Sequence, residues 1–211
     1  MTHSGARGAL LAVCAAALTV LTGCSSDGSP SGTETSSGSS PDVARELTAD
    51  ERPYADAIVA PMQAQSDTPV SDEDARCFAD RVVPVVGLET LRAGGTPAEV
   101  GSLFTHYDLS TLDVSEQTAR DAVAVLDACG IDLREAAVDA ARSDVSSAAA
   151  DCIDTSVDAA EYREILVTQF HRGVTAFEDV TSGDEAGLDA GQKAWAEFAG
   201  CVVENMAPDD E

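Results

Sequence analysis

Ser71-Asp72-Glu73-Asp74-Ala75-Arg76-Cys77-Phe78 is the stretch from which the fold of this chain can be predicted. A serine followed by three acidic residues is typical of a helix start. The serine hydroxyl accepts a hydrogen bond from a free backbone N–H, and the carboxylates lie at the positive end of the helix dipole. The stretch therefore predicts a helix after Ser71. We expect it to end near Val83, with Pro84 and Gly87 as interruptions.

The same pattern returns in the second half of the chain. Ser146 lies six residues before Cys152, as Ser71 lies six before Cys77. Apolar residues follow each Cys at offsets of one and five: Phe78 and Val82 after Cys77, and Ile153 and Val157 after Cys152. The closing helices also align, with Val123, Leu126 and Cys129 matching Trp195, Phe198 and Cys201. The sequence predicts a tandem repeat over residues 71–130 and 146–206. The alternative is that two alanine-rich amphipathic helices align by chance.

Helical signals fill the rest of residues 42–211, which we expect to be all-α. Alanine, aspartate, glutamate and leucine are common, and β-branched runs are short. Thr48–Glu51 begins a helix with Tyr54, Ile58 and Met62 on one stripe, although Pro61 should limit or kink it. Further helices are expected at Leu88–Arg92, from the capping box Thr96–Glu99, from Ser115 to Gly130, at Asp132–Arg142, from Ser146, and at Leu188–Met206.

The N-terminus carries an export signal. Arg7 precedes an apolar run, Leu10 to Leu21, which has the length of a secretory signal and is too short to span a bilayer. The run closes with Leu21-Thr22-Gly23-Cys24, which resembles the lipobox of bacterial lipoproteins. That resemblance implies removal of residues 1–23 and diacylglycerol on the thiol of Cys24. The alternative is an ordinary signal peptide whose cleavage site contains a cysteine.

A tether should separate the anchor from the folded part. Residues 24–41 are almost wholly small and polar, with no aliphatic or aromatic side chain after Cys24. Such a segment has nothing to offset its conformational entropy, so we expect it to be disordered. The predicted organisation is a signal peptide at 1–23, a lipidated tether at 24–41 and one helical domain at 42–211.

Four cysteines lie in the folded part, and in an exported chain they are expected to form disulfides. Three connectivities are possible. If the repeat is real, symmetry favours Cys77 with Cys129 and Cys152 with Cys201, which gives a helical bundle built from two similar disulfide-framed halves. Each bond would close a loop of about 50 residues and stabilise its half by about 4 kcal/mol. No two cysteines stand as closely as zinc ligands usually do, so we expect no metal site and no other cofactor.

The charge balance excludes several partners. The chain has 38 Asp and Glu against 12 Lys and Arg, a formal net charge of −26. Such a surface repels phosphates, so nucleic acid and an anionic membrane face are not expected partners. The surface either keeps an exported protein in solution or attracts cations and basic partners.

No catalytic signature is present. The histidines after the leader are His106, expected in a loop, and His171, expected at a helix end where an imidazolium suits the dipole. No G-x-S-x-G elbow, H-E-x-x-H pair or P-loop occurs. The catalytic residues of any activity are therefore unknown from the sequence.

One acidic segment before the last helix suggests calcium. Residues 179–189 lack the alternating oxygen ligands and the glycine at the sixth position of an EF-hand loop, so we expect a turn and an N-cap. The last helix should place its large apolar residues in the core, or its tryptophan in a ligand pocket; these residues are Trp195, Phe198, Ala199, Val202 and Met206.

As a whole the chain is similar to the small, acidic, alanine-rich lipoproteins of high-GC Gram-positive bacteria. That resemblance implies lipid anchoring at the outer face of the cell membrane and no particular chemistry. The first hypothesis is a non-enzymatic module that binds an envelope protein or a small ligand at the cleft between its halves. The second is an envelope hydrolase that uses carboxylates with His106 or His171. The third is a structural surface spacer.

Overall fold

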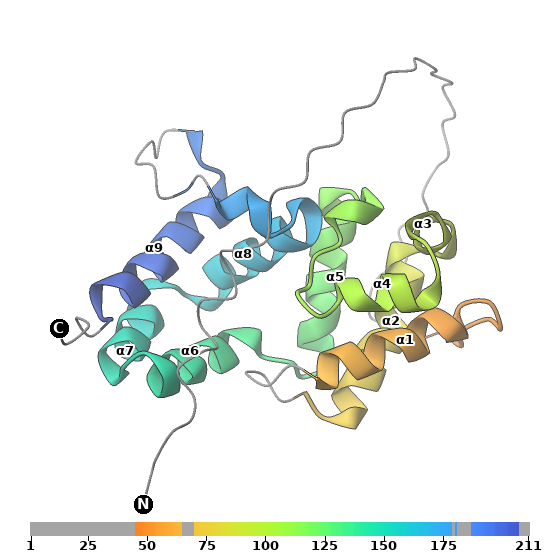
Figure 1. Cartoon of the computed structure of the whole chain (residues 1–211), viewed down its shortest axis with the longest axis horizontal. Coiled ribbons are helices and arrows are strands. Elements are labelled where there is room, and N and C mark those ends of the chain that lie inside the picture. The colour runs from red at the N-terminus through yellow and green to blue at the C-terminus, as the bar shows by residue number, and fades with distance from the viewer. Residues whose placement is uncertain (1–44, 65–69, 179, 181–186, 207–211) are drawn as a thin grey trace, which may run out of the picture. The chain divides into compact units, whose positions relative to one another are not determined.

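The computed structural model describes residues 45–64, 70–178, 180 and 187–206. All regular structure in these ranges is helical, as predicted (Figure 1). The α-helices are α1 (Arg52–Gln63), α2 (Asp72–Val86), α3 (Leu88–Gly94), α4 (Pro97–Leu103), α5 (Glu116–Ala128), α6 (Leu133–Asp144), α7 (Ser147–Ser156), α8 (Ala159–Arg172) and α9 (Ala190–Glu204), with short 3-10 turns η1 (Ser110–Leu112) and η2 (Val174–Phe177). The predicted leader and the whole predicted tether, including Cys24, lie outside the described residues.

The predicted helix starts are confirmed by their caps. Ser71, Ser115 and Ser146 each accept a hydrogen bond from the backbone N–H three residues on. Asp132 does the same for α6. Thr96 and Glu99 form the predicted reciprocal capping box. Short-range sequence chemistry therefore fixes where most of these helices begin.

The two prolines have different outcomes. Helix α2 continues past Pro84, contrary to the prediction, whereas α1 ends two residues after Pro61, in line with the expected limit. Pro84 lies inside α2, which continues to Val86 and ends at Gly87, where φ is +87°. Pro61 lies inside α1, which continues to Gln63. In both helices an apolar residue after the proline is buried, Val86 in α2 and Met62 in α1. Burial of these side chains stabilises the turn that the missing backbone hydrogen bond weakens.

Residues 45–131, here called the N-terminal half, build one large core. Helix α1 packs against α2 and α4, and α2 packs against α5 (Figure 1). The fully buried side chains include Phe78, Phe104, Ile58 and Met62. Helix α4 lies so close to α1 that a β-carbon on Gly101 would stand 2.3 Å from the carbonyl oxygen of Ala57. Glycine is required at this contact.

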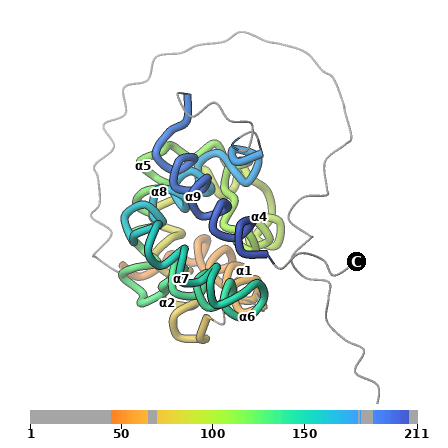
Figure 2. The backbone as a smooth tube through the Cα atoms, turned by 90° about the vertical axis from the view of Figure 1, so that its left-hand side faces the viewer, coloured from red at the N-terminus to blue at the C-terminus, as the bar shows by residue number. Residues whose placement is uncertain are grey.

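Residues 132–206, the C-terminal half, have two smaller clusters. One lies between α6, α7 and α9, which are side by side (Figure 2). The other joins α8, η2 and α9 and includes Ile165, Phe177 and Ala194. Trp195 and Phe198 are partly buried against this second cluster, in line with the expected core role. Met206 was expected there too, and this is wrong: it follows the end of α9 and is 60% exposed.

Each half contains one disulfide. Cys77 of α2 is bonded to Cys129 at the end of α5, and Cys152 of α7 is bonded to Cys201 of α9. This is the connectivity that symmetry favoured. The two halves differ in packing, with one continuous core in the first and two clusters in the second. The internal repeat itself stays a prediction.

Helix α8 connects the halves. Its residues Leu166, Val167 and Phe170 belong to the core of the N-terminal half, whereas Ile165 faces the cluster with α9. It therefore packs on α5 on one side and on α9 on the other. A β-carbon on Gly191 of α9 would stand 2.3 Å from the carbonyl oxygen of Glu164, so α9 also approaches α8 closely.

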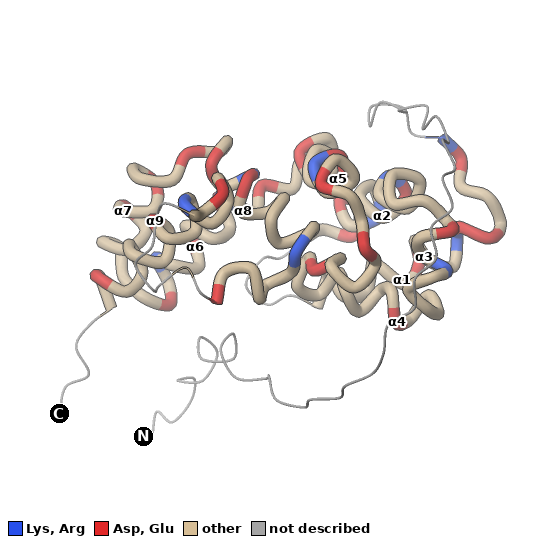
Figure 3. The backbone as a smooth tube through the Cα atoms, turned by 90° about the horizontal axis from the view of Figure 1, so that it is seen from above, with Lys and Arg blue, Asp and Glu red and all other residues tan. Residues whose placement is uncertain are grey.

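Acidic residues occur on helices of both halves, and basic residues are fewer and more isolated (Figure 3). Most of the described arginines pair with a carboxylate, for example Arg52 with Asp80 and Arg76 with Asp56. None of the described helices combines the length and the apolar character needed to cross a membrane.

Candidate functional site

A pocket of about 300 Å³ lies where the two halves meet. We call it the junction pocket. One wall comes from the end of α5, the connection that follows and the start of α6, and the other comes from the first turns of α8. Its lining residues are Val123, Leu126, Asp127, Gly130, Ile131, Asp132, Leu133, Arg134, Ala159, Tyr162, Arg163 and Leu166.

The tight connection between α5 and α6 shapes one wall of this pocket. At the end of α5 the N–H of Gly130 donates to Asp127 and the N–H of Ile131 donates to Leu126, the two bonds of a Schellman motif. Gly130 has φ of +74°, which favours glycine. Asp132 then caps α6 by accepting from the N–H of Glu135 at 2.9 Å. The connection from α5 to α6 is thus short and held by backbone hydrogen bonds, directly after the disulfide at Cys129.

The floor of the pocket is apolar. Its aliphatic side chains are buried; they are Val123, Leu126, Ile131, Leu133 and Leu166. Tyr162 is partly buried beside them, and burial raises the pKa of its hydroxyl, with a further rise from Asp132 opposed by Arg134. The phenol is therefore neutral at physiological pH. Within the described part of the chain, the Tyr162 hydroxyl has no hydrogen-bond partner.

The rim of the pocket carries charges of both signs. Arg163 of α8 donates through Nε to Oδ2 of Asp127 at 2.8 Å, and both side chains are about half exposed. Arg134 of α6 donates through Nε to the carbonyl of Val157 at 2.8 Å and through Nη2 to Asp154. An apolar floor with a few placed polar groups is the usual composition of a small-molecule site.

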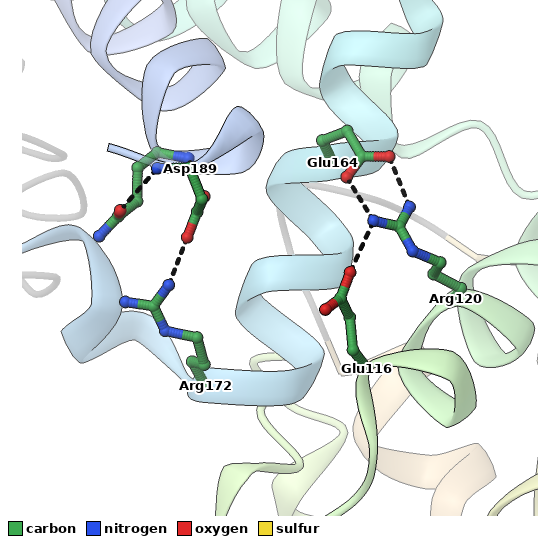
Figure 4. Close-up of polar contacts among 6 residues, drawn as sticks. Glu116, Arg120, Glu164, Arg172 and Asp189 are labelled. Carbon is green, nitrogen blue, oxygen red and sulfur yellow. Dashed lines mark hydrogen bonds and ion pairs between the residues drawn. The ribbon is translucent and has the colours of Figure 1, made fainter. Parts of the chain in front are cut away.

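Further polar contacts hold α8 on α5 beside the pocket. Arg120 of α5 donates to Glu164 of α8 at 2.6 Å and also to Glu116 of its own helix (Figure 4). Two ion pairs therefore join α5 and α8: in one the arginine comes from α5 (Arg120 with Glu164), and in the other it comes from α8 (Arg163 with Asp127). On the far side of α8, Arg172 pairs with Asp189 before α9 (Figure 4).

A row of aromatic rings leads from the pocket into the C-terminal half. The rings of Tyr162 and Phe198 lie 6.2 Å apart, and those of Phe198 and Trp195 stack at 5.5 Å. Phe177 continues the row at 5.0 Å from Trp195. Trp195 does not line the pocket. Trp195 is the sole tryptophan of the chain. Only the ring of Phe198 separates it from Tyr162, which does line the pocket.

Neither His106 nor His171 lines the junction pocket. His106 is exposed in a turn, as expected, and its carbonyl accepts a hydrogen bond from Gln169. His171 lies in the last turn of α8, as expected, with Nδ1 2.8 Å from the carbonyl oxygen of Val114. Both therefore take part in docking the loop before α5 on α8.

Other predicted sites have separate outcomes. The four cysteines of the folded part are the disulfide cysteines. Among the residues described, no three His, Cys, Asp or Glu side chains gather as a metal ion would require. Cys24, where lipidation is predicted, and most of the acidic segment 179–189 lie outside the described residues. Asp189 is described, and it caps α9 in a capping box with Gln192.

Comparison with protein-family models, curated proteins and solved structures finds no match for this chain.

The lining residues themselves were not predicted individually. The sequence suggested a cleft between the halves, but not Tyr162, Arg163 or Arg134. Local pattern carries no signal for them, because they meet only after α8 packs on α5. The one available hint was at residues 129–132, where a cysteine and a glycine come shortly before the aspartate that begins the next helix.

Proposed function

We propose that this protein is a lipid-anchored, extracytoplasmic and non-enzymatic module that binds a small ligand in the junction pocket. The anchor rests on Leu21–Cys24 and the tether on residues 24–41. The observation that carries the binding function is a pocket of about 300 Å³ with walls from both halves, an apolar floor and a charged rim. Neither His106 nor His171 lines it, so no observation favours the hydrolase alternative.

A pocket of this volume lies at the lower end of the range for small-molecule sites, about 300 to 1,000 Å³. The ligand should therefore be a small metabolite and not a folded partner. Because a ligand that binds the folded state raises its stability, thermal unfolding in the presence of candidate compounds reports binding. A compound at about 100 times its Kd should stabilise the chain by about 2.7 kcal/mol.

Two neighbouring alanines of α8 provide a matched pair for this test. Ala159 lines the pocket and is exposed, so Ala159→Phe should fill the opening. Ala160 is also exposed and does not line the pocket, so Ala160→Phe is the control. The exported chain in detergent micelles should show a raised Tm with its ligand in the wild type and in A160F, but not in A159F. An equal response of all three chains would refute binding in this pocket.

The anchor is tested separately with Cys24→Ala. Without the thiol no diacylglycerol can be attached, so the chain should leave the membrane fraction of the cells that express it. Mass spectrometry of the wild-type N-terminal peptide should find an acylated cysteine as residue one. Membrane retention of C24A would contradict lipid anchoring and leave the pocket unaffected.

A further inference from the structure

The charged groups on the rim of the junction pocket retain free hydrogen-bonding capacity. Arg163 uses Nε for Asp127, and within the described residues its two terminal nitrogens have no partner. Arg134 uses Nε and Nη2, which leaves Nη1. On the acidic side, Asp132 uses Oδ1 to cap α6 and Asp127 uses Oδ2 for Arg163. Among the described residues, the second carboxylate oxygen of each of these two aspartates has no hydrogen-bond partner.

These groups surround a floor of aliphatic side chains and the Tyr162 ring. The pocket thus offers guanidinium donors, carboxylate acceptors and an apolar surface together. We propose that it binds a free α-amino acid with an apolar side chain. This inference rests on the proposed function. The α-carboxylate is held by Arg163 and Arg134, the α-ammonium by Asp132 and Asp127, and the side chain lies on the floor.

A ligand with only one charge fits this rim less well. A simple carboxylic acid would place its anion near Asp127 and Asp132 without a compensating ammonium group. It would also have to approach a chain with a formal net charge of −26, which repels anions. A simple amine would leave the free donors of Arg163 and Arg134 without an acceptor. A zwitterion carries no net charge and matches both kinds of group.

The volume of the pocket sets a further limit. About 300 Å³ is at the bottom of the range for small-molecule sites, which favours a single residue over a peptide. The neutral Tyr162 hydroxyl adds one donor and one acceptor to the floor side of the site.

Three probes of nearly equal shape separate the contributions of the ammonium group and the carboxylate to binding. L-Leucine carries both charges, 4-methylpentanoate lacks the ammonium group, and 3-methylbutylamine lacks the carboxylate. Titration calorimetry with the exported chain in detergent micelles should give binding of L-leucine at least about tenfold tighter than either analogue, as expected for loss of a charged hydrogen bond. Equal or tighter binding of either analogue would overturn the zwitterion assignment.

Two variants and a control locate the groups. Asp132→Asn removes the charge but keeps a good N-cap for α6, so it should weaken L-leucine binding about tenfold without unfolding the helix. Arg163→Gln should also weaken it about tenfold. Arg76→Gln is the control, because Arg76 is another half-exposed arginine in a surface ion pair and lies outside the pocket. Unchanged affinity in both D132N and R163Q would overturn the proposed contacts.

Failure of this inference is distinguishable from failure of the proposed function. If none of the three probes binds, the amino-acid assignment is overturned. The A159F and A160F comparison with other compounds then still decides whether the pocket binds any ligand.

Discussion

At the scale of single residues, Glu51 is the most informative side chain of the N-terminal half. It is a buried carboxylate, 4% exposed, directly before α1. Arg45 donates to it at 2.8 Å, and the backbone and hydroxyl of Thr48 both donate at 2.9 Å. The Arg45 hydrogen bond is the main cause that lowers the pKa of Glu51 to about 2; burial opposes it and the Thr48 bonds assist. The carboxylate thereby ties the first described residues to α1.

Glu51→Gln should therefore destabilise the chain in a pH-dependent way. Because the folded-state pKa is lowered, the ionised carboxylate stabilises the fold above its ordinary pKa of 4.5, and this contribution is lost as pH falls towards about 2. Chemical unfolding at neutral pH should show E51Q less stable by about 1 to 3 kcal/mol, with the difference shrinking below pH 4.5.

Glu89→Gln is the matched control for that measurement. The Glu89 side chain is 94% exposed and lies 3.6 Å from Arg92, so its loss should change the free energy of unfolding by less than about 0.5 kcal/mol. A pH-independent difference between E51Q and the wild type would contradict the assigned role of the carboxylate.

The sequence predicted the residue-scale features that depend on near neighbours. Ser71, Ser146 and the Thr96–Glu99 capping box are all where the local pattern placed them. The burial of Glu51 could not be predicted in the same way. A carboxylate in so acidic a chain carries no local mark of burial, which is decided by how α1 packs on α2 and α4.

At the scale of the elements, the sequence predicted most helix starts and the end of α5 at Gly130, but it placed the end of α2 too early. Pro84 was expected to interrupt α2, yet the helix continues because Val86 is buried beyond it. For helix α8 only the end near His171 was predicted, and its start was not. It has apolar residues on more than one face, since it packs on both α5 and α9, and this weakens the periodic signal of a helix with a single buried face.

Two glycine substitutions should have opposite effects, because one glycine lies at a close helix contact and the other has open space beside it. Gly101→Ala would press a β-carbon against the backbone of Ala57, so it should cost about 1 to 3 kcal/mol of unfolding free energy. Gly200 lies in α9 with nothing within 4 Å of the position a β-carbon would take. Gly200→Ala should therefore gain about 0.5 to 1 kcal/mol through helix propensity.

Thermal unfolding of the two variants beside the wild type checks this pair. Expected are a lower Tm for G101A and a higher Tm for G200A. A G101A chain as stable as G200A would show that α1 and α4 are not in close contact.

At the scale of the whole molecule, the two halves depend on their disulfides to different degrees. The N-terminal half has one continuous core, which α8 extends. The C-terminal half has two small clusters, and the Cys152–Cys201 bond lies in the one formed by α6, α7 and α9. With less apolar surface buried in one place, this half should rely more on its disulfide.

Paired substitutions of the cysteines test this difference. Cys152→Ala with Cys201→Ala should cost about 2 to 5 kcal/mol and accelerate hydrogen exchange across α6, α7 and α9. In the Cys77→Ala, Cys129→Ala double variant, the core helices of the N-terminal half should be more protected from hydrogen exchange than α6, α7 and α9 are in the Cys152→Ala, Cys201→Ala double variant. The reverse order of sensitivity would contradict the account of the two cores.

The whole-molecule features were predicted unevenly. The predicted repeat, suggested in part by near-equal cysteine spacing, favoured the observed connectivity, in which each disulfide closes its own segment. A cleft between the halves was expected as well. Its chemistry was not, because Tyr162 and Arg163 reach it through the packing of α8 on α5, which sequence spacing does not encode.

The central claim is that the ligand site is shared by both halves, and hydrogen exchange measured by mass spectrometry tests it most directly. The chain should be compared with and without the compound that best raises its Tm. We predict slower exchange in peptides from residues 123–134 and from residues 159–166 together, since these supply the two walls. Protection limited to one of these segments, or located elsewhere in the chain, would contradict a shared site.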